Sequence, residues 1–261
     1  MVKKILARSY LSLILIIMYA PIALLIVYSF TESTNIGTWS GFSLDLYRQM
    51  FANEEIMEAL FNTILIAIAS SIVSTILGTL GAIGIFYSRR RMKRVLNGIT
   101  QIPVLNAEIV TAISLTILFV TLGVTFNFIT LLIGHVVLTI PFVVLSVMPK
   151  LQQLDPNMYE AALDLGATPS IALRKVIIPE VLPGVLSGFL LCITLSLDDY
   201  IITAFTRNNS FSTLSTYVYG VTAKRGALPP SLRALTTLIT ILMFVFLLLT
   251  NFRKAKSIKN R

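Results

Sequence analysis

The stretch ALFNTILIAIASSIVSTILGTLGAIGIFY, residues Ala59–Tyr87, contains no charged side chain. An α-helix rises about 1.5 Å per residue, so roughly 20 apolar residues are enough to cross the hydrocarbon core of a bilayer. The rest of the chain is similarly apolar: 56% of its 261 residues are hydrophobic, 13% are charged, and the mean hydropathy is +0.84. A soluble domain usually carries about 25% charged residues. The sequence therefore predicts an integral membrane protein.

Five further apolar segments are long enough to span the membrane. We predict an all-α membrane protein with six transmembrane helices, forming a single domain over residues 1–261. The predicted spans are Leu11–Phe30, Ala59–Tyr87, Ile99–Leu122, Ile129–Met148, Gly184–Phe205 and Leu232–Phe252.

Basic residues cluster at the ends of alternate spans, and this pattern predicts the orientation. Loops that stay in the cytoplasm are enriched in Lys and Arg, so the bias places both termini inside. The net charge of +9 is thus a topology signal rather than a nucleic-acid surface. The predicted inside residues are Lys3, Lys4, Arg8, Arg89, Arg90, Arg91, Lys93, Arg94, Lys150, Arg174, Lys175, Arg253, Lys254, Lys256, Lys259 and Arg261.

Small residues recur every three or four positions along the second predicted span. They form one helix face, and small residues let membrane helices approach closely. We interpret this face as a packing surface; its members are Ala67, Ser71, Ser74, Gly78 and Ala82. His135, in the fourth span, has no obvious carboxylate partner in the sequence. A structural role is favoured for it over a proton relay.

A segment between the fourth and fifth spans carries helix start and stop signals. Asp155 can cap a short helix whose first residue is Pro156, and Gly166 can end that helix in the left-handed conformation. Thr168 and Pro169 repeat the start signal, and Pro179 predicts the end of the second helix. The sequence predicts two short helices joined by a tight corner outside the membrane, within residues 150–183.

The same segment resembles the EAA loop of ABC importer permeases. Glu160-Ala161-Ala162 is followed, at the spacing of that loop, by Gly166 and then by Val176-Ile177-Ile178-Pro179. The family pattern ends Ile-x-Leu-Pro, so this chain departs from it only conservatively. The loop also occupies the expected place between the fourth and fifth of six spans.

The resemblance extends over nearly the whole chain to the PotC-type permeases of spermidine/putrescine importers. One departure is Asn106-Ala107-Glu108, where the family has a Ser-Pro-Asp-like sequence; the acidic side chain is kept and the proline is missing. The similar stretches are Trp39-Ser40-Gly41-Phe42, IVTAISLTILFVTLG at Ile109–Gly123, IPFVVLSV at Ile140–Val147, YEAALDLGAT at Tyr159–Thr168, and LSLDDYIITAF at Leu195–Phe205.

The resemblance implies a type I importer fold of the MetI-like kind in a bacterial inner membrane. It implies a heterodimer with a second permease subunit, a dimer of ATPase subunits, an extracytoplasmic substrate-binding protein and a polyamine substrate. The sequence contains no G-x-x-x-x-G-K-[ST] phosphate loop. We therefore expect this chain to be a transport subunit without a bound cofactor, with ATP and Mg²⁺ used by the ATPase.

Two adjacent carboxylates, Asp198 and Asp199, interrupt the fifth predicted span. An ionised carboxylate at the centre of a bilayer costs about 2.5 to 3.5 kcal/mol, so both should face protein or water. On a helix, Asp199 shares a stripe with Cys192, Ser196 and Thr203. We predict that Ser196, Asp198 and Asp199 belong to the substrate pathway, with Asp199 nearer the lumen. The alternative is that an Asp pairs with a helix end or with a basic group of the partner.

Glu108 and Trp39 complete the predicted substrate pathway. A straight third span would place Glu108 roughly 13 Å from the inner surface, and the fifth span would place Asp198 roughly 21 Å from it. A polycation would then meet acidic groups at two depths. Trp39, the only tryptophan, lies in the first outer loop. Its ring could bind an alkylammonium or could anchor the loop at the membrane interface, and both interpretations stay open.

The expected mechanism is alternating access, in which Glu160, Ala161, Ala162 and Gly166 couple the chain to the ATPase. Motion of this loop would pass through Pro179 and Pro183 into the helix that carries the aspartates. Two alternatives remain at this point: an ABC permease for another substrate, and a stand-alone secondary transporter or channel.

Overall fold

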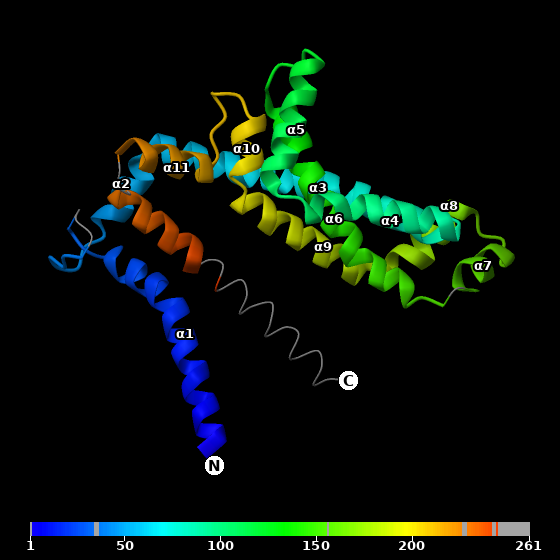
Figure 1. Cartoon of the computed structure of the whole chain (residues 1–261), viewed down its shortest axis with the longest axis horizontal. Helices are drawn as coiled ribbons and strands as arrows, with labels where there is room; N and C mark the ends of the chain where they lie inside the picture. The colour runs from blue at the N-terminus through cyan, green and yellow to red at the C-terminus, as the bar shows by residue number, and fades with distance from the viewer. Residues whose placement is uncertain (1, 34–36, 156, 226–228, 242–243, 245–261) are drawn as a thin grey trace. The chain divides into compact units, whose positions relative to one another are not determined.

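The structure is a computed structural model, shown in Figure 1, that describes residues 2–33, 37–155, 157–225, 229–241 and 244. The described chain is helical apart from its loops and one isolated bridge between Thr31 and Phe42. Contacts divide it into two compact units, residues 1–57 with 218–261, and residues 58–217. Each unit is described by itself.

Four helices are long and apolar enough to cross a membrane by themselves. A further pair, α4 (Arg90–Leu105) and α5 (Glu108–Thr121), passes the same test together but bends by 103° between its members. The described residues therefore hold four candidate spans, or five if the bent pair counts as one. The four are Ser9–Tyr28 within α1 (Val2–Tyr28), α3 (Glu54–Tyr87), α6 (Phe128–Gln152) and the helical run Pro169–Asp198.

The sixth predicted span, Leu232–Phe252, is only partly described. Residues 230–241 are helical, as the apolar pattern predicts, and most of the remainder lies outside the described residues.

The first unit holds α1, α2 (Asp45–Ala52) and helix 230–241. An aromatic group closes the loop after α1: the rings of Phe30 and Phe42 stack at 5.7 Å, and Tyr47 lies 5.2 Å from Phe30. Buried Arg233 donates to the carbonyl of Ser33 at 3.3 Å. Within the predicted first outer loop, α2 is a helix because Leu46 and Met50, one turn apart, become buried.

The second unit is built around α3, α6 and α9 (Ile178–Asp198), as Figure 1 shows. The predicted packing face of α3 is confirmed, because Ala67, Ser71, Ser74 and Ala82 are all buried. At Gly78 the approach to α6 is so close that an added Cβ would lie 2.6 Å from Cβ of Val143. Small residues thus bring the backbones of α3 and α6 together, as in other membrane bundles.

The predicted elbow is present at one end of this unit. The first short helix, α7 (Asn157–Asp164), begins where Asp155 accepts a bond from the Asn157 amide at 2.9 Å. It ends at Gly166, whose φ of +85° is the left-handed conformation that the sequence predicts. Pro156, predicted as the first helical residue, lies outside the described residues.

The predicted stop before Pro179 is wrong. The second short helix, α8 (Pro169–Ala172), begins at Pro169 as expected but runs through a π-helical turn (Leu173–Ile177) directly into α9. In that turn the amide of Ile178 bonds to the carbonyl of Leu173, five residues earlier. A π-helical turn is wider than an α-helical turn, so it accommodates a proline ring that would otherwise meet the carbonyl four residues before it.

The predicted straight spans three and five are also wrong. Span three bends by 103° at Asn106 and Ala107, between α4 and α5. Span five ends its long helix at Asp198, and a separate helix α10 (Ile201–Thr206) follows after Asp199 and Tyr200. Since α5 packs on α10, and α10 on α6, both breaks lie in one region of the unit, and α11 (Leu214–Arg225) begins beside it.

Candidate functional site

The break between α9 and α10 holds the first candidate site. Asp199 lies in extended backbone at φ −65° and ψ 128°, so the chain leaves the helix directly after Asp198. The Asp199 carboxylate accepts from the amides of Ile202 and Thr203 at 3.1 and 2.8 Å, and from the Thr203 hydroxyl at 2.7 Å. Asp199, one residue before the N-cap Tyr200, therefore caps α10 through its side chain, and it satisfies amides that the start of a helix otherwise leaves without partners.

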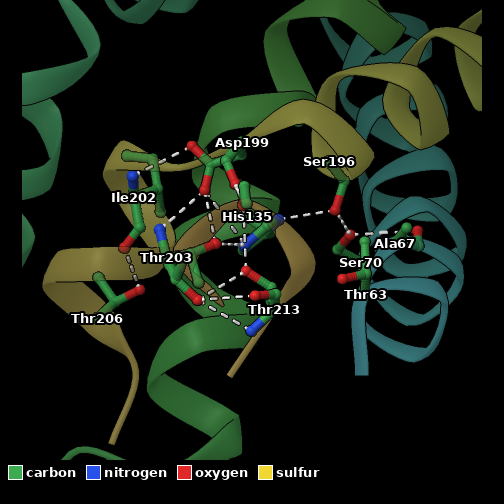
Figure 2. A network of polar contacts seen from close by, with 12 residues as sticks. Thr63, Ala67, Ser70, His135, Ser196, Asp199, Ile202, Thr203, Thr206 and Thr213 are labelled. Atoms are coloured by element: carbon green, nitrogen blue, oxygen red, sulfur yellow. Dashed lines mark hydrogen bonds and ion pairs between the residues drawn. The ribbon is translucent and has the colours of Figure 1, made fainter. Parts of the chain in front are cut away.

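A buried chain of polar contacts connects Asp199 to α6 and α3. Figure 2 shows His135 between the two ends of the break: its Nε2 lies 2.9 Å from the Thr203 hydroxyl, and its Nδ1 lies 2.7 Å from the Ser196 hydroxyl. Ser196 in turn lies 3.2 Å from the hydroxyl of Ser70 on α3. His135 Nε2 is also 3.6 Å from the Asp199 carboxylate.

The two aspartates have opposite environments. Asp199 is 5% exposed and Ser196 is 2% exposed, whereas Asp198 is exposed on the surface of the chain. The stripe of Cys192, Ser196, Asp199 and Thr203 therefore faces α6, and the break turns the Asp199 side chain back onto α10. The position of Asp199 nearer the lumen stays a prediction. A role in the pathway stays a prediction for Ser196, Asp198 and Asp199.

Glu108 is exposed at the first residue of α5, where a carboxylate is favourable beside the helix N-terminus. Its helix α5 packs on α10, which begins directly after the segment that holds Asp198 and Asp199. The predicted depth of Glu108 requires a straight helix that continues from Ile99. The 103° bend between α4 and α5 shows that this helix is not straight. The structure places the start of α5 and the break after Asp198 in one region of the unit, and the two acidic steps stay a prediction.

Trp39 belongs to the first unit and is 53% exposed. Its loop is held at the base, where Thr31 accepts from the amide of Ser40 at 3.2 Å and Ser43 donates to the carbonyl of Phe30 at 2.9 Å. The loop thus presents the indole ring outward from a fixed base. Its role as an aromatic platform or as an interface anchor stays open.

The elbow is the second candidate site. Glu160, Ala161 and Gly166 are exposed, and Ala162 is half-buried. Leu165, at the corner, is 89% exposed, an unusual position for a leucine beside a tight turn. On its other side, α7 is anchored through Tyr159, whose ring lies 5.2 Å from that of Tyr87 and packs on the core of α6 and α9. The elbow therefore has one face fixed to the bundle and one face free in this chain.

Sequence reasoning identified the acidic residues but missed what His135 and Thr203 do. Both lie on predicted spans, and the stripe that links Thr203 to Asp199 is visible in the sequence. His135, however, is 61 residues from Ser196 and 68 from Thr203, so no local pattern could pair them. Among the described residues, no group of His, Cys, Asp or Glu could hold a metal ion.

Comparison with known proteins gives consistent matches. Residues 74–255 match the family described as "Binding-protein-dependent transport system inner membrane component". The spermidine/putrescine transport system permease protein PotC of Haemophilus influenzae is 32% identical over 97% of this chain and 97% of that protein. The putrescine transport system permease protein PotI of Escherichia coli is 31% identical over 85% of this chain and 81% of that protein.

Solved structures give the same fold. A chain of a bacterial ABC transporter involved in the import of the acidic polysaccharide alginate superposes with a TM-score of 0.73. The match covers 97% of this chain and 96% of that chain at 16% sequence identity. At this identity the similarity shows the fold and carries no information about the substrate.

Proposed function

The chain belongs to the family of inner membrane components of binding-protein-dependent transport systems, and we propose that it is the permease subunit of an ATP-driven polyamine importer. The observation that carries the proposal is the full-length identity of 32% to a permease whose name specifies spermidine and putrescine. The chemistry of the first site supports the same substrate class, because Asp198 and Glu108 offer exposed carboxylates to a polycation.

The proposed arrangement in the membrane has six spans with both termini in the cytoplasm. The bent pair α4–α5 counts as the third span, the run α8–α9 continued by α10 as the fifth, and helix 230–241 as the beginning of the sixth. The basic residues between the spans support this orientation. A second permease subunit, two ATPase subunits and an external binding protein would complete the importer, and the ATPase subunits would supply ATP hydrolysis.

The acidic region would act by lowering the electrostatic barrier for an alkylammonium group. Two unit charges 4 Å apart attract by about 4 kcal/mol at an effective dielectric constant of 20. Exposed carboxylates supply this attraction without enclosing the cation, which favours passage over trapping. A permease for an anion would instead need basic groups in this region, and Asp198 and Glu108 would repel its substrate.

The elbow would couple ATP hydrolysis to transport. Its exposed corner, from Glu160 to Gly166, suits a cleft of the ATPase, where Leu165 would become buried. Because α8, the π-helical turn and α9 form one helical run of 30 residues, a displacement of the elbow would reach Asp198 through continuous helix. The link is stiffer than the broken one that the sequence predicts.

The proposal is tested by uptake of labelled spermidine and putrescine in polyamine-uptake-deficient cells that express the complete importer. We expect ATP-dependent uptake by the wild type and a loss of tenfold or more in Asp198→Asn at equal protein in the membrane. Ser187→Ala is the matched control, since its exposed hydroxyl donates to Pro183 within α9. Absence of polyamine uptake by the wild type would overturn the substrate class.

A further inference from the structure

We infer that His135 is a positioning residue: through Thr203 it holds Asp199 as the cap of α10, and so leaves Asp198 as the aspartate that contacts substrate. The inference rests on the proposed transport function and divides the labour between two adjacent carboxylates. The polar groups of His135, Thr203 and Ser196 are buried, so water cannot replace a hydrogen-bond partner that is lost.

The donors and acceptors of this network can be assigned from chemistry. An ionised Asp199 only accepts, so the Thr203 hydroxyl must donate its proton to the carboxylate at 2.7 Å. The Thr203 oxygen can then only accept from His135, whose Nε2 at 2.9 Å must carry a proton. Nδ1 of the neutral ring accepts from the Ser196 hydroxyl at 2.7 Å.

This order of bonds makes the ring nitrogens unequal. The Nε2 side fixes Thr203, and Thr203 gives Asp199 two of its three bonds, one from the amide and one from the hydroxyl. The Nδ1 side connects to Ser196 and Ser70, which join α9 to α3. Only the Nε2 contact connects to the bonds that hold the Asp199 carboxylate. Those bonds set the backbone at the break and therefore the direction of the Asp198 side chain.

The backbone of Asp199 is fixed from another direction. Its carbonyl accepts from the hydroxyl of Ser215 at the start of α11, at 2.6 Å. At Gly134, next to His135, an added Cβ would lie 2.7 Å from Ile202, so α6 and α10 are in close contact. The break is thus held by contacts with both α11 and α6. Asp198 is exposed because the backbone around it has a defined conformation.

Two substitutions separate the nitrogens of His135. A glutamine amide reaches the place of Nε2 and keeps a donor for Thr203, whereas the shorter asparagine amide reaches the place of Nδ1 and keeps an acceptor for Ser196. Both are uncharged and smaller than histidine, so each serves as the control for the other. We expect His135→Asn to raise KM for spermidine about tenfold, the equivalent of about one lost hydrogen bond at a buried site. His135→Gln should stay within about threefold of wild type.

The expected split is in KM rather than in the maximal rate, measured at equal protein in the membrane with the complete importer. Equal effects of the two substitutions, or a loss confined to the maximal rate, would overturn the inference.

A double-mutant cycle gives a second readout that does not need the substrate. In the purified complex, His135→Asn with Asp199→Asn should lower the thermal midpoint no further than Asp199→Asn alone, because both break the same network. His135→Asn with Asp198→Asn should be additive. If the wild type imports no polyamine, the proposed function fails, and this cycle alone decides the inference: additivity at Asp199 overturns it.

Discussion

Asp198 and Asp199 show how one peptide unit changes the role of a side chain. Asp198 is the last residue of α9 and is exposed, whereas Asp199 is already extended and turns onto the following helix. Two amides and a hydroxyl replace the water that the Asp199 carboxylate loses on burial. Bonds to a charged group contribute about 1.5 to 3 kcal/mol each, so the cap stabilises the break as well as the charge.

Gly78 and Gly81 give the first prediction, on packing at single residues. A Cβ at Gly78 would lie 2.6 Å from Val143, but a Cβ at Gly81 would meet nothing within 4 Å. Gly78→Ala should destabilise the unit by about 1 to 3 kcal/mol, because overpacking displaces α3 from α6. Gly81→Ala is the control and should be neutral or slightly stabilising, since Ala favours a helix.

The measurement is the thermal midpoint of the purified complex in detergent. Val143→Ala combined with Gly78→Ala should recover part of the loss, because it removes the Cγ atoms that also crowd the site. Equal midpoints for Gly78→Ala and Gly81→Ala would contradict the close approach of α3 and α6.

At the scale of elements, the helical run from Pro169 to Asp198 is the main mechanical feature. Two prolines near its middle, Pro179 and Pro183, do not end it, because the π-helical turn precedes Pro179 and α9 continues through Pro183. The core beside it includes Val147, Leu151 and Val181, so the run is packed along α6. A helix held in this way transmits displacement better than a hinge.

The second prediction concerns the corner that joins α7 to this run. Gly166 has φ +85°, which a β-branched residue adopts only with strain and which asparagine tolerates. Gly166→Val should reduce ATP-dependent uptake severalfold and uncouple ATP hydrolysis from substrate. Gly166→Asn should keep most of both activities.

ATPase activity and uptake of the reconstituted importer, measured side by side, check this prediction. Apart from its chain neighbours, no described residue lies within 4 Å of the Gly166 Cβ position, so a loss in Gly166→Val would come from backbone conformation. Full coupling in Gly166→Val would show that the left-handed corner is unnecessary.

At the scale of the whole molecule, the second unit places its two candidate sites at opposite ends of α9. The elbow precedes this helix and the acidic region follows it, as Figure 1 shows for α7 and α10. One helix therefore connects the part proposed to meet the ATPase with the part proposed to meet the substrate. This continuity supports the proposed link between ATP hydrolysis and substrate movement.

The third prediction tests assembly of the complex at the exposed corner. Leu165 is 89% exposed here, and burying a leucine contributes about 1.5 to 3 kcal/mol. Leu165→Gln should weaken retention of the ATPase subunits during purification by about tenfold or more. Met92→Gln, at another exposed apolar residue of a predicted cytoplasmic segment, should leave retention unchanged.

Co-purification at increasing salt and detergent, followed by quantitation of the ATPase, gives the comparison. Equal retention in both variants would place the ATPase contact elsewhere on the chain. Loss in both would indicate a general defect of the membrane subunit.

Patterns among neighbouring residues predict the long apolar helices, the packing face of α3, and the start and corner of the elbow. Each depends on neighbours in the chain: the length of an apolar run, a three-to-four residue period, a cap, or a glycine at a helix end. The resemblance of the EAA segment likewise predicted the family that the comparisons show. Local chemistry was enough for these features.

Tertiary contacts surround the breaks at Asn106 and Asp199, the continuous helix through Pro179, and the division between Asp198 and Asp199. A break in an apolar span costs backbone hydrogen bonds. At the second break the Asp199 carboxylate accepts from two of the freed amides, and a distant residue, His135, supports this local cap. Thr203 and His135, 68 residues apart, together complete the surroundings of one carboxylate. The role of Asp199 therefore depends on partners that only folding brings within hydrogen-bond distance.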